Sequence, residues 1–239
     1  MYKRIILKLS GETLAPERIE ANHSGSVTFD PARVDRAADI IIQLAKLGMQ
    51  VGVVMGGGNI WRGRFTDEMN PVQADQMGML ATVINALAVQ EAILRAGHKA
   101  VVYTAQEMTR FAELYRADRA VASMEEGAVV LLAGGTGNPF FTTDTGASLR
   151  AIEIRADVML KGTRVDGVYT ADPEKDATAK KFDKITYDEV IARNLKVMDI
   201  TATALFKENN MPIYVFNMDK EGNLEKMIDG ENVGTLVSN

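Results

Sequence analysis

The segment at residues 133–150, AGGTGNPFFTTDTGASLR, contains residues whose types and spacing suit the binding of an anion. It follows a short β-branched apolar run that is typical of a buried strand. Its glycines allow backbone N–H groups to approach a ligand closely, and the start of a helix adds partial positive charge. An ordinary threonine-capped loop between a strand and a helix has similar residues, so this segment alone leaves both interpretations open.

Small residues also follow three other predicted strands, at Ser10-Gly11, at Gly56-Gly57-Gly58 and at Gly162-Thr163. In open α/β sheets ligands bind beyond the carboxyl ends of the strands. Four such ends at one edge predict a ligand with several phosphates, or two phosphorylated ligands. The sequence has no G-x-x-x-x-G-K-[ST] motif and no G-x-G-x-x-G after a first strand, which argues against a P-loop enzyme and a dinucleotide-binding Rossmann site.

Three cations stand close to these glycines in the sequence. Lys8 ends the first predicted strand, Lys161 follows the strand predicted at residues 157–160, and Arg62 follows the triple glycine. Each could be a solvated side chain at the end of an element. The functional interpretation is that Lys8 and Lys161 neutralise the charge of a transferring phosphoryl group.

Carboxylates stand near the same loops. Asp144 lies among threonines and Asp199 lies at a predicted helix start, so either could orient the two lysines. Asp75 is either a helix-start aspartate stabilised by the helix dipole or a partner for a sugar hydroxyl. The segment VDGVYTADP, residues 165–173, could enclose a nucleoside with an aromatic side chain against the base and a carboxylate toward the ribose.

The elements that must position these residues alternate between strands and helices. Strands are predicted at residues 2–9, 50–55, 99–104, 128–133, 157–160, 213–216 and 235–237, and helices at 31–47, 71–97, 110–124, 146–155, 186–193 and 199–208. This alternation predicts an α/β fold, a three-layer α/β/α sandwich with a central, mostly parallel sheet. We expect one domain over residues 1–239, with lobes at about 1–156 and about 157–239.

The helix predicted at residues 71–97 carries apolar residues at helical spacing, which predict its buried face. These residues are Val72, Met77, Met79, Leu80, Val83, Ile84, Leu87, Ile93 and Leu94. Its methionines are expected to fill the core.

Composition excludes several classes of chemistry. The chain has 239 residues and no cysteine, so disulfides, thiolate metal sites and cysteine nucleophiles are excluded. Two histidines argue against a histidine-based metal site or base, and a net charge of −5 argues against general nucleic-acid binding. The N-terminal apolar run is too short and too charged for a signal peptide, and we expect no run near the ~18 residues of a membrane span. These features predict a cytoplasmic protein.

In combination the motifs resemble the bacterial UMP kinase (uridylate kinase) family of the amino acid kinase superfamily, over nearly the whole chain. The resemblance rests on KLSGE at residues 8–12, VGVVMGGGNIWRG at 51–63, D-x-M-G-M-L-A-T at 75–82, GTGNPFFTTD at 135–144, K-x-T-x-V-D-G-V-Y-T-A-D-P at 161–173 and KVMD at 196–199. The segment ERIEANHSGSVTF, within residues 12–29, matches no pattern of the family.

The resemblance implies transfer of the γ-phosphate of ATP to UMP, giving UDP and ADP in pyrimidine nucleotide (CTP and UTP) biosynthesis. It implies an acceptor-binding N-terminal lobe and an ATP-binding C-terminal lobe. The ATP contacts it implies are Lys8, Leu9, Ser10, Gly11, Gly58, Arg62, Thr163, Tyr169 and Asp172. The UMP contacts it implies are Gly57, Asp75, Thr136, Gly137, Asn138, Pro139, Phe140, Phe141, Thr142 and Thr143. Mg²⁺ is the expected cofactor, held mainly by ATP oxygens and water rather than by protein ligands.

Within this interpretation Lys8, Lys161, Asp144 and Asp199 are the predicted catalytic residues. The two lysines flank the transferring group, and the two carboxylates hold the lysines and help to place the metal. The phosphate of UMP is the nucleophile and is already ionised near neutral pH, so no general base is required.

The resemblance also implies a homo-oligomer, most often a hexamer, activated by GTP and inhibited by UTP, with no nucleic-acid or membrane partner. Because residues 12–29 depart from the family, the response to effectors is its least supported part. Two alternatives stay open: a kinase for another acidic acceptor, such as an amino acid carboxylate or carbamate, and a non-catalytic nucleotide sensor or storage module on the same fold.

Overall fold

The computed structural model describes residues 2–16, 28–62, 69–163, 165–176, 178–218, 220, 222–228 and 230–239. Most of the unmatched segment, residues 17–27, lies outside the described residues, as do Gly63 and residue 164 of two motifs. In chain order the elements are β1 (Arg4–Leu9), the 3₁₀ helix η1 (Gly11–Leu14), α1 (Pro31–Lys46), β2 (Gln50–Met55), α2 (Pro71–Arg95), β3 (Ala100–Thr104), β4 (Glu113–Leu114), α3 (Ala117–Glu125), β5 (Val129–Ala133), α4 (Thr143–Glu153), β6 (Val158–Thr163), β7 (Lys184–Thr186), α5 (Tyr187–Ala192), α6 (Ile200–Glu208), β8 (Ile213–Asn217), α7 (Asn223–Ile228) and β9 (Gly234–Ser238).

The described strands form a mostly parallel sheet, and they divide between two compact units. Unit 1 comprises Met1–Lys8 and Asp144–Asn239, and unit 2 comprises Leu9–Thr143. The strand order is β1-β6-β8-β9-β7 in unit 1 and β4-β3-β5-β2 in unit 2. The predicted α/β fold with a central, mostly parallel sheet is confirmed. The contacts divide the chain at residue 144 rather than near 157, and residues 1–8 group with the later segment because β1 pairs with β6.

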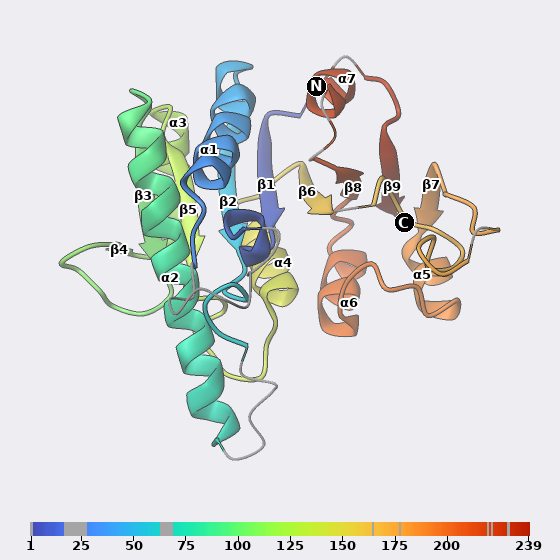
Figure 1. The fold of residues 1–239 in the computed structure, drawn as a ribbon, viewed down its shortest axis with the longest axis horizontal. Helices are drawn as coiled ribbons and strands as arrows, with labels where there is room; N and C mark the ends of the chain where they lie inside the picture. The colour runs from blue at the N-terminus through green and yellow to red at the C-terminus, as the bar shows by residue number, and fades with distance from the viewer. Residues whose placement is uncertain are drawn as a thin grey trace. The chain divides into compact units, whose positions relative to one another are not determined.

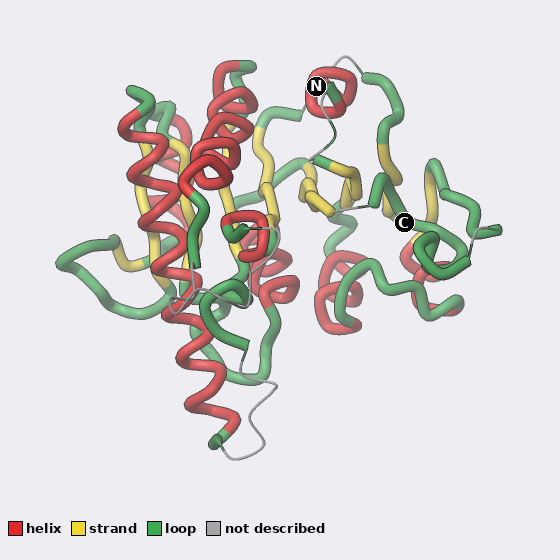
Figure 2. Tube along the Cα trace, viewed as in Figure 1, coloured by secondary structure: helices red, strands yellow, loops and turns green. Residues whose placement is uncertain are grey.

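In unit 2 strands β2, β5, β3 and β4 are parallel, and helices cover the sheet. Helices α1 and α2 pack side by side, with α2 on β3 and β5, while α3 packs on β5 and β2. Figure 1 shows α1 and α2 in front of these strands and α3 behind them. The N-terminal part of α2 extends past the carboxyl ends of the strands, where loops gather (Figure 2).

In unit 1 the register of two parallel strands determines the site. Strand β1 pairs with β6 so that Ile5, Ile6, Leu7 and Lys8 lie opposite Val158, Met159, Leu160 and Lys161. Strand β6 pairs in parallel with β8, and β8 pairs antiparallel with β9. The three residues before each lysine, at positions 5–7 and 158–160, are apolar and fully buried, so the two lysines lie at the polar ends of a dry core.

The predicted helix starts are confirmed where a capping residue stands immediately before the helix in the sequence. Asp30 accepts a hydrogen bond from the backbone N–H of Ala32 at 3.0 Å, immediately before Pro31. Asn70 caps α2 and Asp199 caps α6 in the same way. Thr186 forms a capping box with Glu189 at the start of α5. Side-chain caps replace the missing helical partners of the first N–H groups, which is why these residues fix the starts.

Four local predictions are wrong. The helix predicted at residues 146–155 begins at Thr143, so Asp144 lies in its first turn. The strand predicted at residues 157–160 continues to Thr163, so Lys161 lies within β6 rather than after it. Residues 113–114 form β4 beside β3, and the helix predicted at 110–124 begins only at Ala117. On α2, the large side chains of Met77, Leu80, Ile84 and Leu94 are exposed.

Val83 and Ile93 are buried as predicted, but most of the buried face of α2 consists of smaller residues, together with one amide. The buried residues are Ala74, Ala81, Thr82, Val83, Asn85, Ala86, Val89, Ala92 and Ile93. Near the glycine loop a small side chain is required, because the Cβ of Ala81 lies where a larger side chain would meet the backbone of Gly57.

Helix α2 also departs from the expectation about membrane spans. By length and composition it could cross a membrane, with a mean hydropathy of 1.6 over an 18-residue window of which 44% is buried. Its contacts with α1, β3 and β5 are those of a core helix in unit 2.

Candidate active site

In unit 1 two lysines share one aspartate. The Nζ of Lys8 lies 2.9 Å from Oδ1 of Asp144, and the Nζ of Lys161 lies 2.9 Å from Oδ2 of the same carboxylate. The three side chains are only 12–17% exposed. The structure thus brings together three of the four residues predicted to be catalytic, although their roles stay predictions.

The fold places this cluster through one register and one helix start. Lys8 and Lys161 are paired positions on neighbouring parallel strands, so their side chains leave the sheet on the same side. Asp144 lies in the first turn of α4, where the helix dipole stabilises a carboxylate.

Burial and charge act in opposite directions on Asp144. Burial alone raises the pKa of this carboxyl, but Lys161 and Lys8 together outweigh it, so the pKa lies below its ordinary value. The ionised carboxylate therefore stabilises the fold at neutral pH, and this stabilisation is lost as the pH falls through the lowered pKa.

The ammonium of Lys161 has a different balance. Burial lowers its pKa below the ordinary lysine value, and the nearby Lys8 lowers it further, while Asp144 and Asp199 oppose the shift. Lys161 also donates a hydrogen bond to the carbonyl of Val197 at 2.5 Å. Lys161 therefore donates to two acceptors, Asp144 and the carbonyl of Val197, although its burial favours the uncharged amine.

Asp199, the fourth predicted catalytic residue, joins α4 to α6. Its carboxylate accepts hydrogen bonds from the hydroxyl of Thr145 at 3.0 Å and from the backbone N–H of Ala202 at 2.8 Å. Because Thr145 follows Asp144 in the first turn of α4, this contact fixes the helix end that presents Asp144 to the lysines.

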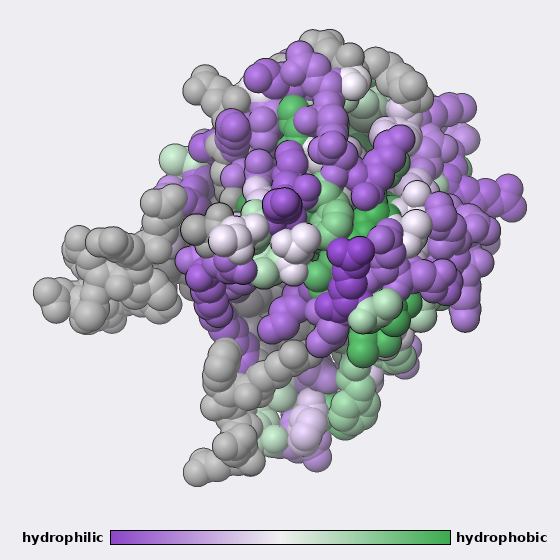
Figure 3. Space-filling model, turned by 90° about the vertical axis from the view of Figure 1, so that its right-hand side faces the viewer, coloured by the Kyte–Doolittle hydropathy of each residue, from purple (hydrophilic) through white to green (hydrophobic). Residues whose placement is uncertain are grey.

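A pocket of about 290 Å³ opens beside this cluster in unit 1. Its walls are mainly apolar, with lysines and short polar side chains among them: Asp144, Lys161, Val190, Ile191, Asn194, Leu195, Lys196, Val197, Met198, Ile200 and Thr203. Two of the apolar residues are exposed, Ile191 at 49% and Ile200 at 79%. The side of the molecule drawn in Figure 3 is mostly hydrophilic, with apolar areas between the hydrophilic ones.

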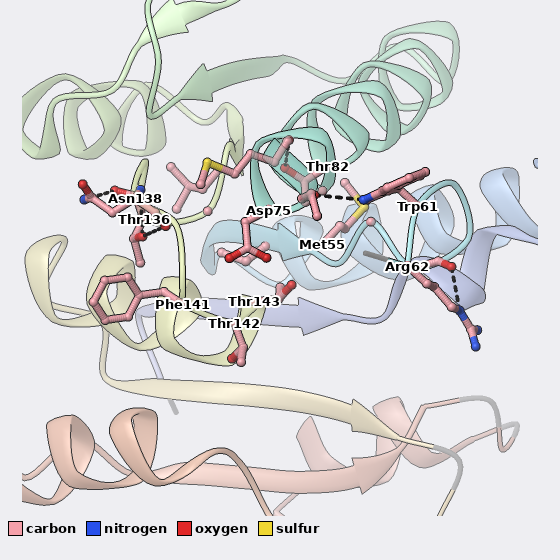
Figure 4. A pocket seen from close by; sticks show the side chains of 18 of the residues that line it. Met55, Trp61, Arg62, Asp75, Thr82, Thr136, Asn138, Phe141, Thr142 and Thr143 are labelled. Atoms are coloured by element: carbon pink, nitrogen blue, oxygen red, sulfur yellow. Dashed lines mark hydrogen bonds between the residues drawn. The ribbon is translucent and has the colours of Figure 1, made fainter. Parts of the chain in front are cut away.

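Unit 2 holds a larger pocket of about 410 Å³. It is lined by Glu12, Val54, Met55, Gly57, Gly58, Trp61, Arg62, Ala74, Asp75, Gly78, Met79, Thr82, Leu132, Gly135, Thr136, Asn138, Phe141, Thr142 and Thr143. Figure 4 shows Asp75 near its centre, Asn138 and Phe141 on one side and Trp61 and Arg62 on the other. Seven of the ten residues predicted to contact UMP therefore line one cavity, together with Gly58 and Arg62 from the predicted ATP contacts.

Asp75 holds the loop that closes one side of this pocket. Its Oδ2 accepts a hydrogen bond from the backbone N–H of Phe140 at 2.7 Å. Phe140 has a φ of 72°, which is unusual for a residue other than glycine, and its side chain is 74% exposed. The aspartate predicted to bind a sugar hydroxyl thus also stabilises a strained backbone turn at the pocket.

The triple-glycine loop lies against α2 at a distance that excludes side chains. A Cβ on Gly57 would lie 2.8 Å from the Cβ of Ala81 and 2.9 Å from the carbonyl oxygen of Gly78. Glycine at this position lets the backbone line the pocket without displacing the helix.

Arg62 makes two polar contacts within the protein at the edge of this pocket. Its Nε donates to the carbonyl of Gly58 at 2.9 Å, and its guanidinium pairs with Glu12 at 2.8 Å. Glu12 ends the KLSGE motif, in which Ser10 precedes η1 and Gly11 begins it. The predicted ATP contacts Leu9, Ser10 and Gly11 therefore lie in the same unit as Arg62.

The residues predicted to enclose adenosine make local contacts in unit 1. Thr163 donates to the carbonyl of Val165, and the hydroxyl of Tyr169 donates to Asp166. Asp172 accepts from the backbone N–H of Glu174 at 3.1 Å. None of the three lines either pocket described above.

Sequence reasoning missed several residues of the unit 2 pocket. Trp61, the single tryptophan, forms a wall and donates its indole N–H to the carbonyl of Ala74 at 2.9 Å. Met55 and Met79 complete the apolar lining. Their signals were proximity in the sequence to the glycine loop and to Asp75, and membership of the motifs at residues 51–63 and 75–82.

The described residues contain no group of three or more histidine, cysteine, aspartate or glutamate side chains that could hold a metal ion. Asp144 has an ammonium on each oxygen, and Asp199 caps a helix. Within the described part of the chain, no cage of protein ligands is arranged for a cation.

A family model, related proteins and solved structures all match this chain over most or all of its length. Residues 3–217 match the model of the Amino acid kinase family. The uridylate kinases of Parabacteroides distasonis and Phocaeicola vulgatus are 56% and 57% identical to this chain, with 100% of the chain and 99% of each relative covered. The crystal structure of UMP kinase from Bacillus anthracis superposes with a TM-score of 0.92 at 37% identity, covering 99% of this chain and 96% of that one.

The lysine–aspartate cluster leads to a prediction about stability. Asp144→Asn leaves two buried ammonium groups without their shared counter-charge and should lower the free energy of unfolding by about 3–5 kcal/mol. Lys8→Met removes one of two repelling charges and leaves the Lys161–Asp144 pair, so its loss should be clearly smaller. Urea denaturation at pH 7 measures both values, and equal losses would contradict the shared-carboxylate interpretation.

Proposed function

This chain belongs to the amino acid kinase family, and we propose that it transfers the γ-phosphate of ATP to UMP, giving UDP and ADP in pyrimidine nucleotide biosynthesis. Its relatives over the full length are uridylate kinases, and a solved neighbour is a UMP kinase. The observation that carries the proposal is the pair of buried ammonium groups on one carboxylate. We propose a cytoplasmic location, as expected for an enzyme of nucleotide synthesis.

The chemistry of phosphoryl transfer matches what this cluster offers. The transition state spreads negative charge over the transferring oxygens, and catalysis consists mainly of positioning and charge stabilisation. Lys8 and Lys161 supply two charges held in place before the substrate arrives, so little reorganisation is needed. Asp144 keeps both ammonium groups oriented, and Asp199 fixes the helix end that carries Asp144. UMP brings its own ionised nucleophile, and no side chain need remove a proton.

We assign the acceptor to the pocket of unit 2. A cavity of about 410 Å³ with apolar walls and a few polar groups suits a nucleoside monophosphate. The carboxylate of Asp75 can accept from a ribose hydroxyl, and the backbone of Gly57 and of residues 136–143 surrounds the same space. An apolar wall of Trp61, Met55 and Met79 suits the flat face of a base.

We assign the adenosine of the donor to unit 1, with Thr163, Tyr169 and Asp172 as its proposed contacts. Lys161 belongs to the same unit and is the proposed ammonium for the phosphate tail. The proposed phosphate contacts Leu9, Ser10, Gly11, Gly58 and Arg62 belong to unit 2.

Mg²⁺ is the proposed cofactor, and the residues present fit a metal carried by the nucleotide. Both oxygens of Asp144 face lysines, so ATP phosphate oxygens and water would supply most ligands, as Mg²⁺ prefers. When bound, the ion neutralises charge on the phosphates. The lysines then need to stabilise only the charge on the group in transfer.

We further propose that the chain assembles as a homo-oligomer, a hexamer as in the family it resembles, with GTP as activator and UTP as inhibitor. Self-association is supported by the exposed apolar stripe of α2, defined as Met77, Leu80, Ile84 and Leu94. These positions lie at helical spacing on one face. Apolar residues exposed singly would be scattered over the surface, whereas these four share one side of α2.

The direct test of the function is formation of UDP. Purified chain with ATP, Mg²⁺ and UMP should produce UDP and ADP in a coupled assay, while CMP, aspartate and glutamate should be poor acceptors. Addition of GTP or UTP tests the effectors in the same assay. Nucleotide binding without UDP would instead support a sensor, and preference for an amino acid would support the rival kinase.

Lys8→Met tests the proposed catalytic charge. Removing one preorganised charge should lower kcat by about 10²–10³-fold. The affinity for UMP, followed by the fluorescence of Trp61, should change little. Lys99→Met removes an exposed lysine and is the matched control. An unchanged kcat with a raised KM would remove the assigned role.

The lowered pKa of Lys161 predicts an alkaline limit to activity. Because a lowered pKa means that the proton is lost at lower pH, kcat should fall with a midpoint below 10.5, the ordinary lysine value. Arginine stays charged throughout this pH range. The Lys161→Arg variant should be less active than the parent, but its kcat should not fall at alkaline pH. Circular dichroism over the same range controls for unfolding, and an identical midpoint in both proteins would contradict the assignment.

The stripe on α2 predicts an effect on assembly. Ile84→Glu places a charge in the apolar contact and should reduce the mass measured by sedimentation. Gln43→Glu adds the same charge at an exposed site of α1 and should leave the mass unchanged. A monomeric parent protein, or an unaltered mass for Ile84→Glu, would rule out this interface.

A further inference from the structure

Two asparagines, one fully buried and one partly buried, form an amide pair beside the triple-glycine loop of unit 2. The Nδ2 of Asn85 donates to Oδ1 of Asn59 at 2.8 Å, and the Nδ2 of Asn59 donates back to Oδ1 of Asn85 at 3.1 Å. Asn85, on α2, is 0% exposed. Burial of an amide is costly unless its hydrogen bonds are made, so this reciprocal pair holds the two side chains in one arrangement.

The pair also binds backbone on both sides. The Nδ2 of Asn85 donates to the carbonyl of Gly56 at 2.7 Å, at the point where β2 ends and the glycine loop begins. The Nδ2 of Asn59 donates to the carbonyl of Thr28 at 3.2 Å. Gly56 in turn donates its N–H to the carbonyl of Leu9 at 3.0 Å. The pair therefore connects α2 to the loop and, through Gly56, to the segment that precedes Gly11.

The turn at Gly11 rests directly on this pair. A Cβ on Gly11 would lie 2.4 Å from Oδ1 of Asn59 and 2.7 Å from the carbonyl oxygen of Gly56. A shift of Asn59 would therefore displace the turn of the KLSGE motif and the glycine loop together. Neither asparagine lines the pocket of unit 2, so neither is placed to touch the acceptor.

The same face of α2 anchors the other loop of the pocket. Thr82, three residues before Asn85, accepts at its hydroxyl oxygen from the backbone N–H of Gly134 at 2.8 Å and donates to the carbonyl of Met79 at 2.7 Å. Asp75, seven residues before Thr82, accepts from Phe140. One helix face thus holds both glycine-containing loops of the pocket by side-chain hydrogen bonds.

We propose that Asn85 is a positioning residue for phosphoryl transfer, acting through Asn59 to hold the loop Gly56-Gly57-Gly58 and the turn at Gly11 in the geometry that the reaction requires. The proposal rests on the function proposed above. Loops that carry the backbone groups around phosphates must be placed within fractions of an ångström, because a 1 Å displacement can cost about 10²-fold in rate. Asn85 supplies that placement from outside the pocket.

The test compares Asn85→Ala with a matched variant on the same helix. Gln90→Ala removes a side-chain amide that donates to the carbonyl of Ala100 at 3.1 Å, toward β3 and not toward the loops. Both variants lose an amide-to-backbone contact of α2, so a purely structural role predicts similar effects. Measurements are kcat with saturating ATP, Mg²⁺ and UMP below both melting temperatures, thermal unfolding, and UMP affinity from Trp61 fluorescence.

Asn85→Ala should lower kcat by about 10–100-fold, while UMP affinity changes by less than about threefold. Gln90→Ala should keep kcat within about twofold of the parent even where its melting temperature falls comparably. Trp61 donates its backbone N–H to the carbonyl of Gly57, so its fluorescence should report a displaced loop in Asn85→Ala only.

Asn59→Ala breaks the same pair from the loop side at a less buried position, so it carries the test if Asn85→Ala fails to fold. It should show the same fall in kcat, and the double variant should lose no more than the larger single loss, because the two side chains act as one unit. The inference is overturned if either foldable variant keeps the kcat of the parent, or if the losses of Asn85→Ala and Gln90→Ala are equal. A parent that forms no UDP would instead overturn the proposed function.

Discussion

Lys8 and Lys161 occupy paired positions on two neighbouring parallel strands, and this register imposes the main electrostatic constraint on unit 1. Like charges directly opposed on a sheet repel, and burial weakens the screening by water. One carboxylate resolves the conflict because it has two oxygens, one for each ammonium. Helix α4 must therefore begin where its first turn presents Asp144 to both strands, and Asp199 fixes that end through Thr145.

Such a cluster gives little net stability, because taking its charged groups out of water costs about as much free energy as their mutual attraction returns. Apolar residues at these three positions would pack more simply at the end of a core that is otherwise dry. Natural sequences keep such costly arrangements mainly at functional sites. Ammonium groups fixed in place are what a phosphoryl group in transfer requires, so the cost in stability and the proposed reaction have the same physical origin.

Local signals in the sequence predicted the elements and many residues of the site. Asp30, Asn70, Thr186 and Asp199 cap helices as expected, because capping depends on a few neighbouring backbone groups. The meeting of Lys8, Asp144 and Lys161 followed from strand order, although β6 extends further than its apolar run. Contacts between distant segments left no such signal: Asn85 and Asn59 pair across the fold, and β4 forms because it lies beside β3.

The face of α2 shows most clearly why pattern reasoning fails when both sides of a helix are occupied. An amphipathic helix turns its large apolar residues to the core, but here glycine loops must approach the helix closely, and only small or hydrogen-bonding residues such as Ala81, Thr82 and Asn85 allow it. The large residues Leu80 and Ile84 lie on the opposite face, where they are exposed. One face of α2 thus meets the close approach of the pocket loops, and the other carries the exposed apolar stripe.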